Sequence, residues 1–333
     1  MSAPGAYIFG CEGLRLSATE KAFFAESDPL GFILFARNVD TPDQLRSLTS
    51  ELRDCVGRDA MILIDQEGGR VERLTAPHWR EWIPPLSQVE GAAEAAAEIM
   101  KLRYRVIAAE LRAVGVDVNC APCADIARPD THPVLYNRCY GMNPVQVAKI
   151  GRAVADGLLA GGVLPVLKHI PGHGAATADS HLELPRVDLP AQTLFDEDFN
   201  AFKALSDLPL GMTAHVVFEA LDSVHCATNS SIVHQIMRKD IGFDGLLMSD
   251  DISMHALSGD MQNRCEIALG AGCDIILHCN GKMPEMLDIA KACGALNTAA
   301  LTRADAALAL RGAPEDPVDL IAQWDARMAV THV

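Results

Sequence analysis

Short apolar segments alternate with longer amphipathic stretches along most of the chain. Eight of these segments have the length of a strand, and most are hydrophobic on both faces, as the strands of a covered parallel sheet are. They are residues 7–9, 31–35, 61–64, 116–121, 164–167, 210–213, 245–248 and 274–277. We therefore expect eight buried strands that are separated by helices.

The stretches between these segments carry the residue types that begin helices. A Thr-Pro pair precedes a predicted helix over 43–56, and an Asn-Pro pair precedes one over 145–160. The longest predicted helix covers 92–114, and the last one covers 301–311.

This alternation predicts an α/β fold, a single-domain (β/α)8 TIM-type barrel over residues 1–333. An open doubly wound sheet is disfavoured, because no glycine-rich dinucleotide or phosphate fingerprint follows the first strand. No stretch has the length and composition of a linker to a second domain. We expect the acidic tail over 313–333 either to dock on the barrel or to stay loose.

Ionisable residues follow most of the predicted strands. They are Asp65-Gln66-Glu67, Asp125, Lys168-His169, His215, Asp250-Asp251 and His278. In a barrel of this type the chemistry takes place at the carboxyl ends of the strands. The preference for Asp and His at these positions therefore predicts a shared polar cleft.

The stretch from Lys168 to His181 is the strongest local indication of an active site. Lys168 and His169 come at the end of a predicted strand, and proline and glycine then interrupt regular structure. After a run of small residues come Asp179 and His181, close enough in an extended chain for the carboxylate to orient the imidazole. We expect residues 174–181 to be mobile without a ligand and to close over a bound one, because small residues give this loop little apolar surface.

Asp250 and Asp251 end the seventh predicted strand. A carboxylate at the mouth of a barrel suits either a nucleophile for the anomeric carbon of a sugar or a metal ligand. Together with an imidazole that donates a proton, it suits glycoside hydrolysis. Neighbouring residues of a strand point to opposite faces, so we expect only one of the two carboxylates to face the cleft.

Two patterns that look like metal sites are interpreted otherwise. His169 and His173 have a spacing that binds zinc within a helix, but an intervening Pro-Gly pair excludes the helix. Cys120 and Cys123 form a C-x-x-C motif that follows a strand and has no second pair elsewhere. We therefore expect neither a metal site nor a redox pair.

Charge and composition narrow the class of partner. The 28 basic and 44 acidic residues give a net charge of −16, which argues against nucleic acid or an anionic membrane as a partner. The longest weakly polar stretch, 153–167, is too short to span a bilayer. The first 20 residues lack a signal-peptide pattern, and the ten cysteines are scattered singly, so we expect a cytoplasmic protein.

Four motifs in order along the chain carry a resemblance to a known family. They are I-D-Q-E-G-G-R-V at 64–71, K-H-I-P-G-H-G at 168–174, D-S-H at 179–181 and S-D-D-I-S-M at 249–254. The chain resembles glycoside hydrolase family 3, and within it the cytoplasmic single-domain β-N-acetylglucosaminidases of bacterial cell-wall recycling. The resemblance implies a retaining mechanism through a covalent glycosyl-aspartate, no cofactor, and action on N-acetylglucosamine glycosides such as muropeptides. The sequence does not fix the oligomeric state, for which we expect a monomer.

Carried over by position, the resemblance implies a role for each of eight residues. Asp250 is the nucleophile, and His181 is the acid/base, which Asp179 assists. The residues that hold the N-acetylglucosamine are Asp65, Arg73, Arg138, Lys168 and His169. The family typically reads G-E-R-S-Y around the arginine, whereas this chain has an asparagine, Asn137, before Arg138. The direction in which Arg138 points is therefore left open.

Other mechanisms and substrates remain alternatives. Hydrolysis assisted by the acetamido group of the substrate needs adjacent carboxylates, which Asp250 and Asp251 supply. Phosphorolysis is conceivable, because a histidine acid/base carries no negative charge to repel phosphate. Chitin-type oligosaccharides are alternative substrates. A zinc hydrolase would need a His-x-His motif after the first strand, and residues 7–16 contain no histidine. A sugar-binding protein with an inactive site would lack the nucleophile or the proton donor.

Overall fold

The computed structural model describes residues 3–180 and 182–331. Within these residues, eight parallel strands close into a barrel in the order β1-β10-β9-β7-β5-β4-β3-β2. Their bounds are β1 Gly5–Gly10, β2 Pro29–Leu34, β3 Met61–Ile64, β4 Val118–Asn119, β5 Leu164–Ile170, β7 Leu210–Thr213, β9 Leu246–Asp251 and β10 Ile275–His278. Each overlaps one of the predicted apolar segments, so the predicted (β/α)8 barrel is confirmed.

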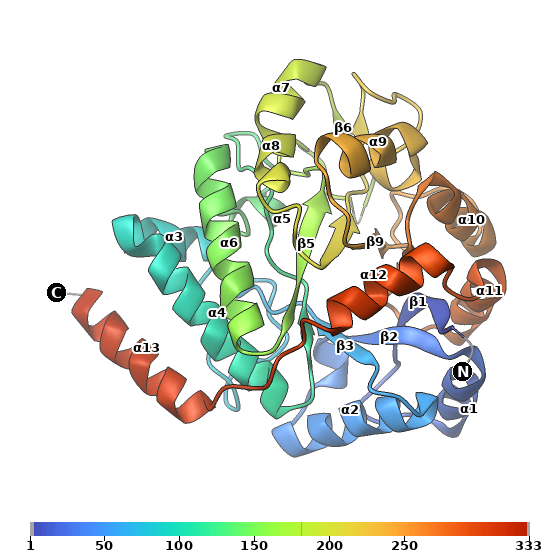
Figure 1. Ribbon diagram of the computed structural model, residues 1–333, viewed down its shortest axis with the longest axis horizontal. Coiled ribbons are helices and arrows are strands. Elements are labelled where there is room, and N and C mark those ends of the chain that lie inside the picture. Colours follow the sequence, from blue (N-terminus) through green and yellow to red (C-terminus); the bar gives the residue numbers. More distant parts are fainter. Residues whose placement is uncertain (1–2, 181, 332–333) are drawn as a thin grey trace.

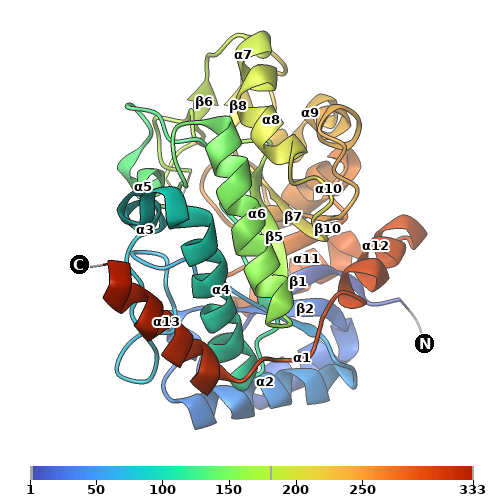
Figure 2. The same cartoon turned by 60° about the vertical axis from the view of Figure 1, so that its left-hand side comes forward.

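Helices cover the outside of the barrel (Figures 1 and 2). They are α1 Ala18–Ser27, α2 Pro42–Val56, α3 Pro85–Ala92, α4 Ala96–Ala113, α5 Pro133–Tyr136, α6 Pro144–Ala160, α7 Ala191–Asp196, α8 Asp198–Lys203, α9 Ser231–Gln235, α10 Met261–Ala271, α11 Met283–Cys293, α12 Thr298–Leu308 and α13 Pro317–Thr331. Helix α2 begins where predicted, since the Thr41 hydroxyl accepts from the Gln44 amide. The predicted helix over 92–114 is wrong in its first turn. Ala93 has a positive φ of 47°, so α3 ends at Ala92 and α4 begins at Ala96.

Two strands extend further toward the carboxyl end of the barrel than predicted. Strand β5 continues through Lys168 and His169 to Ile170, and β9 continues through Asp250 and Asp251. Lys168 and His169 therefore lie within a strand and not after it. The ladder between β9 and β10 is also irregular, because Ile275 pairs with Met248 but Leu277 with Asp251. Such an irregularity breaks the alternation of side chains between the two faces.

The tail after the last predicted helix forms α13, which lies beside α4 (Figures 1 and 2). Leu320 and Trp324 are buried, and the Trp324 ring packs edge-on against Trp82 with 5.0 Å between centroids. Arg105 of α4 forms an ion pair with Glu315 just before the helix. The described part of the tail is therefore docked on the outer helices. In the described residues, no helix is both long and apolar enough to cross a membrane.

Two apolar layers fix the positions of the strand ends. Small and branched side chains such as Ile8, Leu63 and Val166 fill the inside of the barrel. A second, larger cluster fills the space between the strands and the helices. A two-stranded parallel sheet, β6 (Arg186–Val187) with β8 (Val217–Phe218), forms beyond the carboxyl ends (Figure 2). The strand ends therefore rest on a packed core, while the connecting loops surround them.

Candidate active site

A cavity of about 370 Å³ opens at the carboxyl ends of the strands. Its lining includes every predicted site residue that the structure describes: Asp65, Arg73, Arg138, Lys168, His169, Asp179 and Asp250. The remaining predicted residue, His181, lies outside the described residues. Side chains separated by up to 185 positions in the sequence are thus brought to one place by strands β3, β5 and β9 and the loops that follow β3 to β5.

Buried and half-buried charges of both signs form a network on one side of the cavity. Lys168 Nζ lies 2.8 Å from Asp65 Oδ1 and 2.7 Å from Glu67 Oε1. Arg138 donates two hydrogen bonds to Glu67, at 2.9 and 2.8 Å, and Arg73 donates to Asp65 at 3.1 Å. We call Asp65, Glu67, Lys168 and Arg138 the ion clamp. Because each charge in it has a partner of opposite sign, the desolvation of these groups is offset by their mutual attraction.

The ion clamp keeps its members charged. Burial alone would raise the pKa of Asp65, but Lys168 and Arg73 lower it overall. Burial would also raise the pKa of Glu67. Arg138 and Lys168 have the larger, opposite effect and lower this pKa to about 2. The two carboxylates in turn raise the pKa of Lys168 against the effect of burial. At neutral pH the cavity therefore offers fixed acceptors and donors to the hydroxyl groups of a sugar.

Glu67 was not among the predicted site residues, although it determines the direction of Arg138. The sequence left that direction open because Arg138 follows Asn137 where the family has an acidic residue. The structure shows that Arg138 points to Glu67, which comes from the loop after β3. A signal was present in the sequence: Glu67 lies two positions after Asp65, on the same side of an extended segment.

A second set of contacts fixes His169. Its Nδ1 lies 2.7 Å from Asp125 Oδ2, and Asp125 Oδ1 accepts from the backbone amide of His173 at 2.6 Å. Burial would raise the pKa of Asp125, but His169 lowers it overall, so the carboxylate is ionised. Asp125 therefore holds one ring nitrogen of His169 and leaves Nε2 available to a ligand in the cavity.

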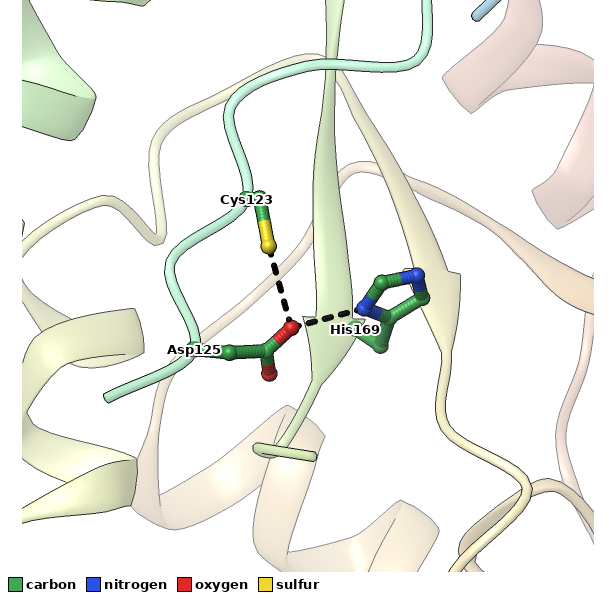
Figure 3. Close-up of side chains that lie close together, drawn as sticks. All are labelled: Cys123, Asp125 and His169. Atoms are coloured by element: carbon green, nitrogen blue, oxygen red, sulfur yellow. Dashed lines mark hydrogen bonds and ion pairs between the residues drawn. The ribbon is translucent and has the colours of Figure 1, made fainter. Parts of the chain in front are cut away.

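Cys123 completes a compact group with Asp125 and His169 (Figure 3). Cys123 Sγ lies 3.2 Å from the same Asp125 oxygen that faces His169. Cys139 and burial together raise the pKa of the Cys123 thiol, so it is a hydrogen-bond donor at neutral pH. A zinc ion held by all three residues would require the thiolate and would replace both hydrogen bonds. The three side chains fit a device that orients His169 better than they fit a metal site.

Asp250 and Asp251 have different surroundings. Asp250 Oδ1 accepts from the Asp251 amide at 2.8 Å; burial would raise its pKa, but His215 and His169 lower it, so the carboxylate is ionised. Asp251 accepts from Ser253 and from the Cys279 amide, so both of its oxygens are engaged. The expectation that only one residue faces the cleft is wrong, because both line the cavity. The irregular ladder beside them explains the lost alternation.

Hydrogen bonds between neutral groups hold part of the loop after β5. His173 Nε2 and the Ser180 hydroxyl share a bond of 3.2 Å, and both side chains are buried. Thr131 donates to the Gly174 carbonyl at 2.5 Å. A Cβ on Gly174 would lie 1.9 Å from the Ile126 carbonyl oxygen, so the loop needs glycine there. Asp179 lines the cavity next to Ser180. Whether the loop moves stays a prediction.

Comparison with known proteins identifies the architecture. The model of the glycosyl hydrolase family 3 N-terminal domain matches residues 9–309. A "Beta-hexosaminidase" of Methylococcus capsulatus is 38% identical over 278 residues, which cover 82% of each chain. The native structure of NagZ from Neisseria gonorrhoeae is similar with a TM-score of 0.87 and 30% identity, covering 98% of this chain and 97% of that one. The same protein in complex with N-trifluoroacetyl-D-glucosamine has a TM-score of 0.87 and covers 99% of this chain and 98% of that one, also at 30% identity.

Proposed function

The chain belongs to glycoside hydrolase family 3, and we propose that it is a retaining exo-β-N-acetylglucosaminidase that forms a covalent glycosyl-aspartate. It is a glycoside hydrolase of the β-hexosaminidase type. The observation that carries the mechanism is the ionised Asp250 carboxylate on the wall of a cavity that Asp65, Lys168 and Arg138 of the ion clamp also line. A nucleophile and a set of sugar-binding charges are thus supplied by the same strand ends.

In the first step, a carboxylate oxygen of Asp250 attacks the anomeric carbon. The bond to the leaving oxygen breaks, and His181 gives that oxygen a proton. In the second step, His181 takes a proton from water, and the water oxygen displaces Asp250 from the anomeric carbon. Two inversions give net retention, and the enzyme returns to its starting state.

The ion clamp and its neighbours hold the non-reducing sugar during both steps. Asp65 accepts hydrogen bonds from hydroxyl groups, Lys168 and Arg73 donate, and His169 adds the ring nitrogen that Asp125 leaves available. A hydrogen bond to a charged group is worth roughly 1.5–3 kcal/mol. A few of them in a buried cavity are enough to place one sugar ring against Asp250.

The substrate that we propose is a muropeptide, and the place of action is the cytoplasm, as in cell-wall recycling. Support comes from the similarity to β-hexosaminidases and to NagZ from Neisseria gonorrhoeae, which forms a complex with N-trifluoroacetyl-D-glucosamine, an analogue of N-acetylglucosamine. Chitin-type oligosaccharides are the competing substrates. Turnover of cell-wall disaccharides against chitobiose tests this choice, and equal or higher turnover of chitobiose would contradict it.

Hydrolysis assisted by the substrate is disfavoured by one observation. That mechanism needs a second carboxylate to orient the acetamido group, and the oxygens of Asp251 are engaged by Ser253 and Cys279. Phosphorolysis is tested by turnover with and without phosphate. Formation of N-acetylglucosamine 1-phosphate would show that phosphate, and not water, is the acceptor.

A further inference from the structure

Arg70 stands on a turn that the backbone holds in place at the edge of the cavity. The amides of Glu67 and Gly68 both donate to the Val71 carbonyl, at 2.9 and 3.0 Å, and the Gly69 amide donates to the Trp82 carbonyl at 2.7 Å. The two glycines have φ angles of +99° and +64°, which favour glycine. Arg70 lines the cavity but is exposed to solvent. Its side chain therefore starts from a fixed point at the mouth of the site.

No residue in the described part of the chain neutralises the charge of Arg70. Every other arginine in residues 3–180 and 182–331 forms a hydrogen bond or an ion pair. Arg70 forms neither with any described residue. Its neighbours in the cavity, Arg73 and Arg138, are both engaged by carboxylates. In a chain of net charge −16, an unpaired guanidinium at a binding cavity is therefore a distinctive feature.

The depth of the cavity separates Arg70 from the groups that hold the sugar. Lys168 is 2% exposed and lines the cavity together with Asp250. A sugar bound to the ion clamp and Asp250 has its leaving group directed outward, toward the exposed edge. Arg70 is at that edge, so it faces the part of the substrate that departs.

We propose that Arg70 selects substrates whose leaving group carries an anion, most directly a carboxylate close to the glycosidic bond. The inference rests on the proposed function, since it concerns the leaving-group side of the same site. A guanidinium can donate two parallel hydrogen bonds to one carboxylate. It also offsets locally the repulsion that a strongly negative protein exerts on an anionic substrate.

The test uses two substrates that differ in charge and hardly in size: a carboxyphenyl β-N-acetylglucosaminide and the corresponding carbamoylphenyl glycoside. The quantity measured is the ratio of kcat/KM for the acid to kcat/KM for the amide. Arg70→Gln should lower this ratio about tenfold, as expected for the loss of one charged hydrogen-bonded pair. Arg70→Lys should retain part of the preference, because it keeps the charge but not the fork of donors. Added salt should lower the ratio in the wild type and not in Arg70→Gln.

Arg46→Gln is the matched control, because Arg46 pairs with Asp43 on the exposed side of α2. Its ratio should equal that of the wild type. Equal ratios in the wild type and Arg70→Gln would overturn the inference while leaving the proposed function intact. A wild type that cleaves neither glycoside would overturn the proposed function and the inference with it.

Inorganic phosphate is the other possible source of the anion. To test this source, turnover of the carbamoylphenyl glycoside is measured with and without added phosphate. Turnover that rises with phosphate in the wild type but not in Arg70→Gln would show that Arg70 receives the acceptor, which would overturn the assignment to the leaving group. Turnover independent of phosphate in both proteins, with the tenfold change in ratio, supports the assignment as stated.

Discussion

The strand-end side of the cavity and its loop side are built from different interactions. On the strand side, the half-buried Asp65 and the buried Glu67 and Lys168 are ions whose charges compensate one another. On the loop side, His173 and Ser180 are neutral and share a hydrogen bond. Burial and His169 lower the pKa of His173 to about 4, so it carries no charge at neutral pH. In the proposed mechanism the strand side supplies the charges for binding and nucleophilic attack, and we expect the loop, which is held here by a neutral hydrogen bond, to separate from the barrel at lower cost.

The largest expected effect is that of Asp250→Asn, on the strand side. Loss of the nucleophile should lower kcat by on the order of 10⁴-fold or more, while N-acetylglucosamine still binds, because the ion clamp is intact. Steady-state kinetics and calorimetric titration with the sugar measure the two effects. The matched variant is Asp251→Asn, whose loss should fall mainly on stability, since Asp251 holds Ser253 and Cys279. Near-wild-type turnover in Asp250→Asn, or equal damage to turnover in both variants, would contradict the assignment.

On the loop side, His181→Ala should show an effect that depends on the leaving group. Help from a general acid is worth about 10²–10⁴-fold, and a good leaving group needs little of it. We expect the large loss for a natural disaccharide and a much smaller one in the glycosylation step of an activated aryl glycoside. Asp179→Asn should give a milder form of the same defect. Equal losses on both substrates would indicate that His181 is structural.

Glu67→Gln breaks the ion clamp without removing a predicted catalytic group. Breaking a buried ion pair typically costs 3–5 kcal/mol, and we expect about 3 kcal/mol here, because Lys168 keeps its bond to Asp65. The free energy of unfolding from denaturant titration measures this. Asp43→Asn, which breaks the exposed pair with Arg46, should change it by less than about 0.5 kcal/mol. A Glu67→Gln variant with unchanged stability and unchanged sugar affinity would mean that the ion clamp contributes to neither.

Acid should act on both sides of the cavity, first on the loop side, as pH falls from the ordinary histidine pKa of 6.5 toward the His173 pKa of about 4, and at lower pH on the strand side through Glu67. The pKa of Glu67 is about 2 in the folded protein, below its ordinary value of 4.5, so the unfolded chain takes up the proton first as pH falls. This part of the stability is complete above about pH 5 and is lost as pH falls toward about 2. Unfolding titrations of the wild type and Glu67→Gln across that range measure it. A wild-type curve parallel to that of the variant would exclude Glu67 as the source.

Ser180→Ala has the smallest expected effect. Removing a neutral hydrogen bond costs about 1 kcal/mol, so the loop should loosen while the barrel keeps its stability. Hydrogen exchange across 172–180 should become faster, with exchange in β5 outside the loop unchanged. If the loop amides of the wild type already exchange without protection, the hydrogen bond between His173 and Ser180 does not stabilise the loop in solution.

The barrel was predictable from the sequence because its strands are nearly uniform in hydrophobicity, and that pattern needs no knowledge of long-range contacts. The same is true of the strand-end residues, whose common location follows from the fold once the strands are ordered. The sequence could not show which charged side chains contact each other in the site. Glu67 pairs with Arg138, and Asp125 pairs with His169, although these partners are 71 and 44 residues apart in the sequence. The irregular pairing of β9 with β10 beside Asp250 also made the prediction from alternating strand faces wrong.

Helix boundaries also could not be predicted fully from local sequence. The alanine-rich stretch over 92–114 has strong helix propensity throughout, yet Ala93 adopts a positive φ and interrupts it. The docking of α13 depends on the contact between Trp82 and Trp324, which are far apart in the sequence. Local propensity carries no information on such contacts, so the sequence left the position of the tail open.

Trapping of the covalent intermediate tests the central claim most directly. A fluorinated N-acetylglucosaminyl donor with a good leaving group forms the glycosyl-enzyme faster than water removes it. Peptide mass spectrometry should then find one fluorinated N-acetylglucosaminyl group, bound to Asp250, in the wild type and in Asp251→Asn but not in Asp250→Asn. An enzyme that turns over ordinary substrate but is never modified, or is modified at another residue, would contradict the account.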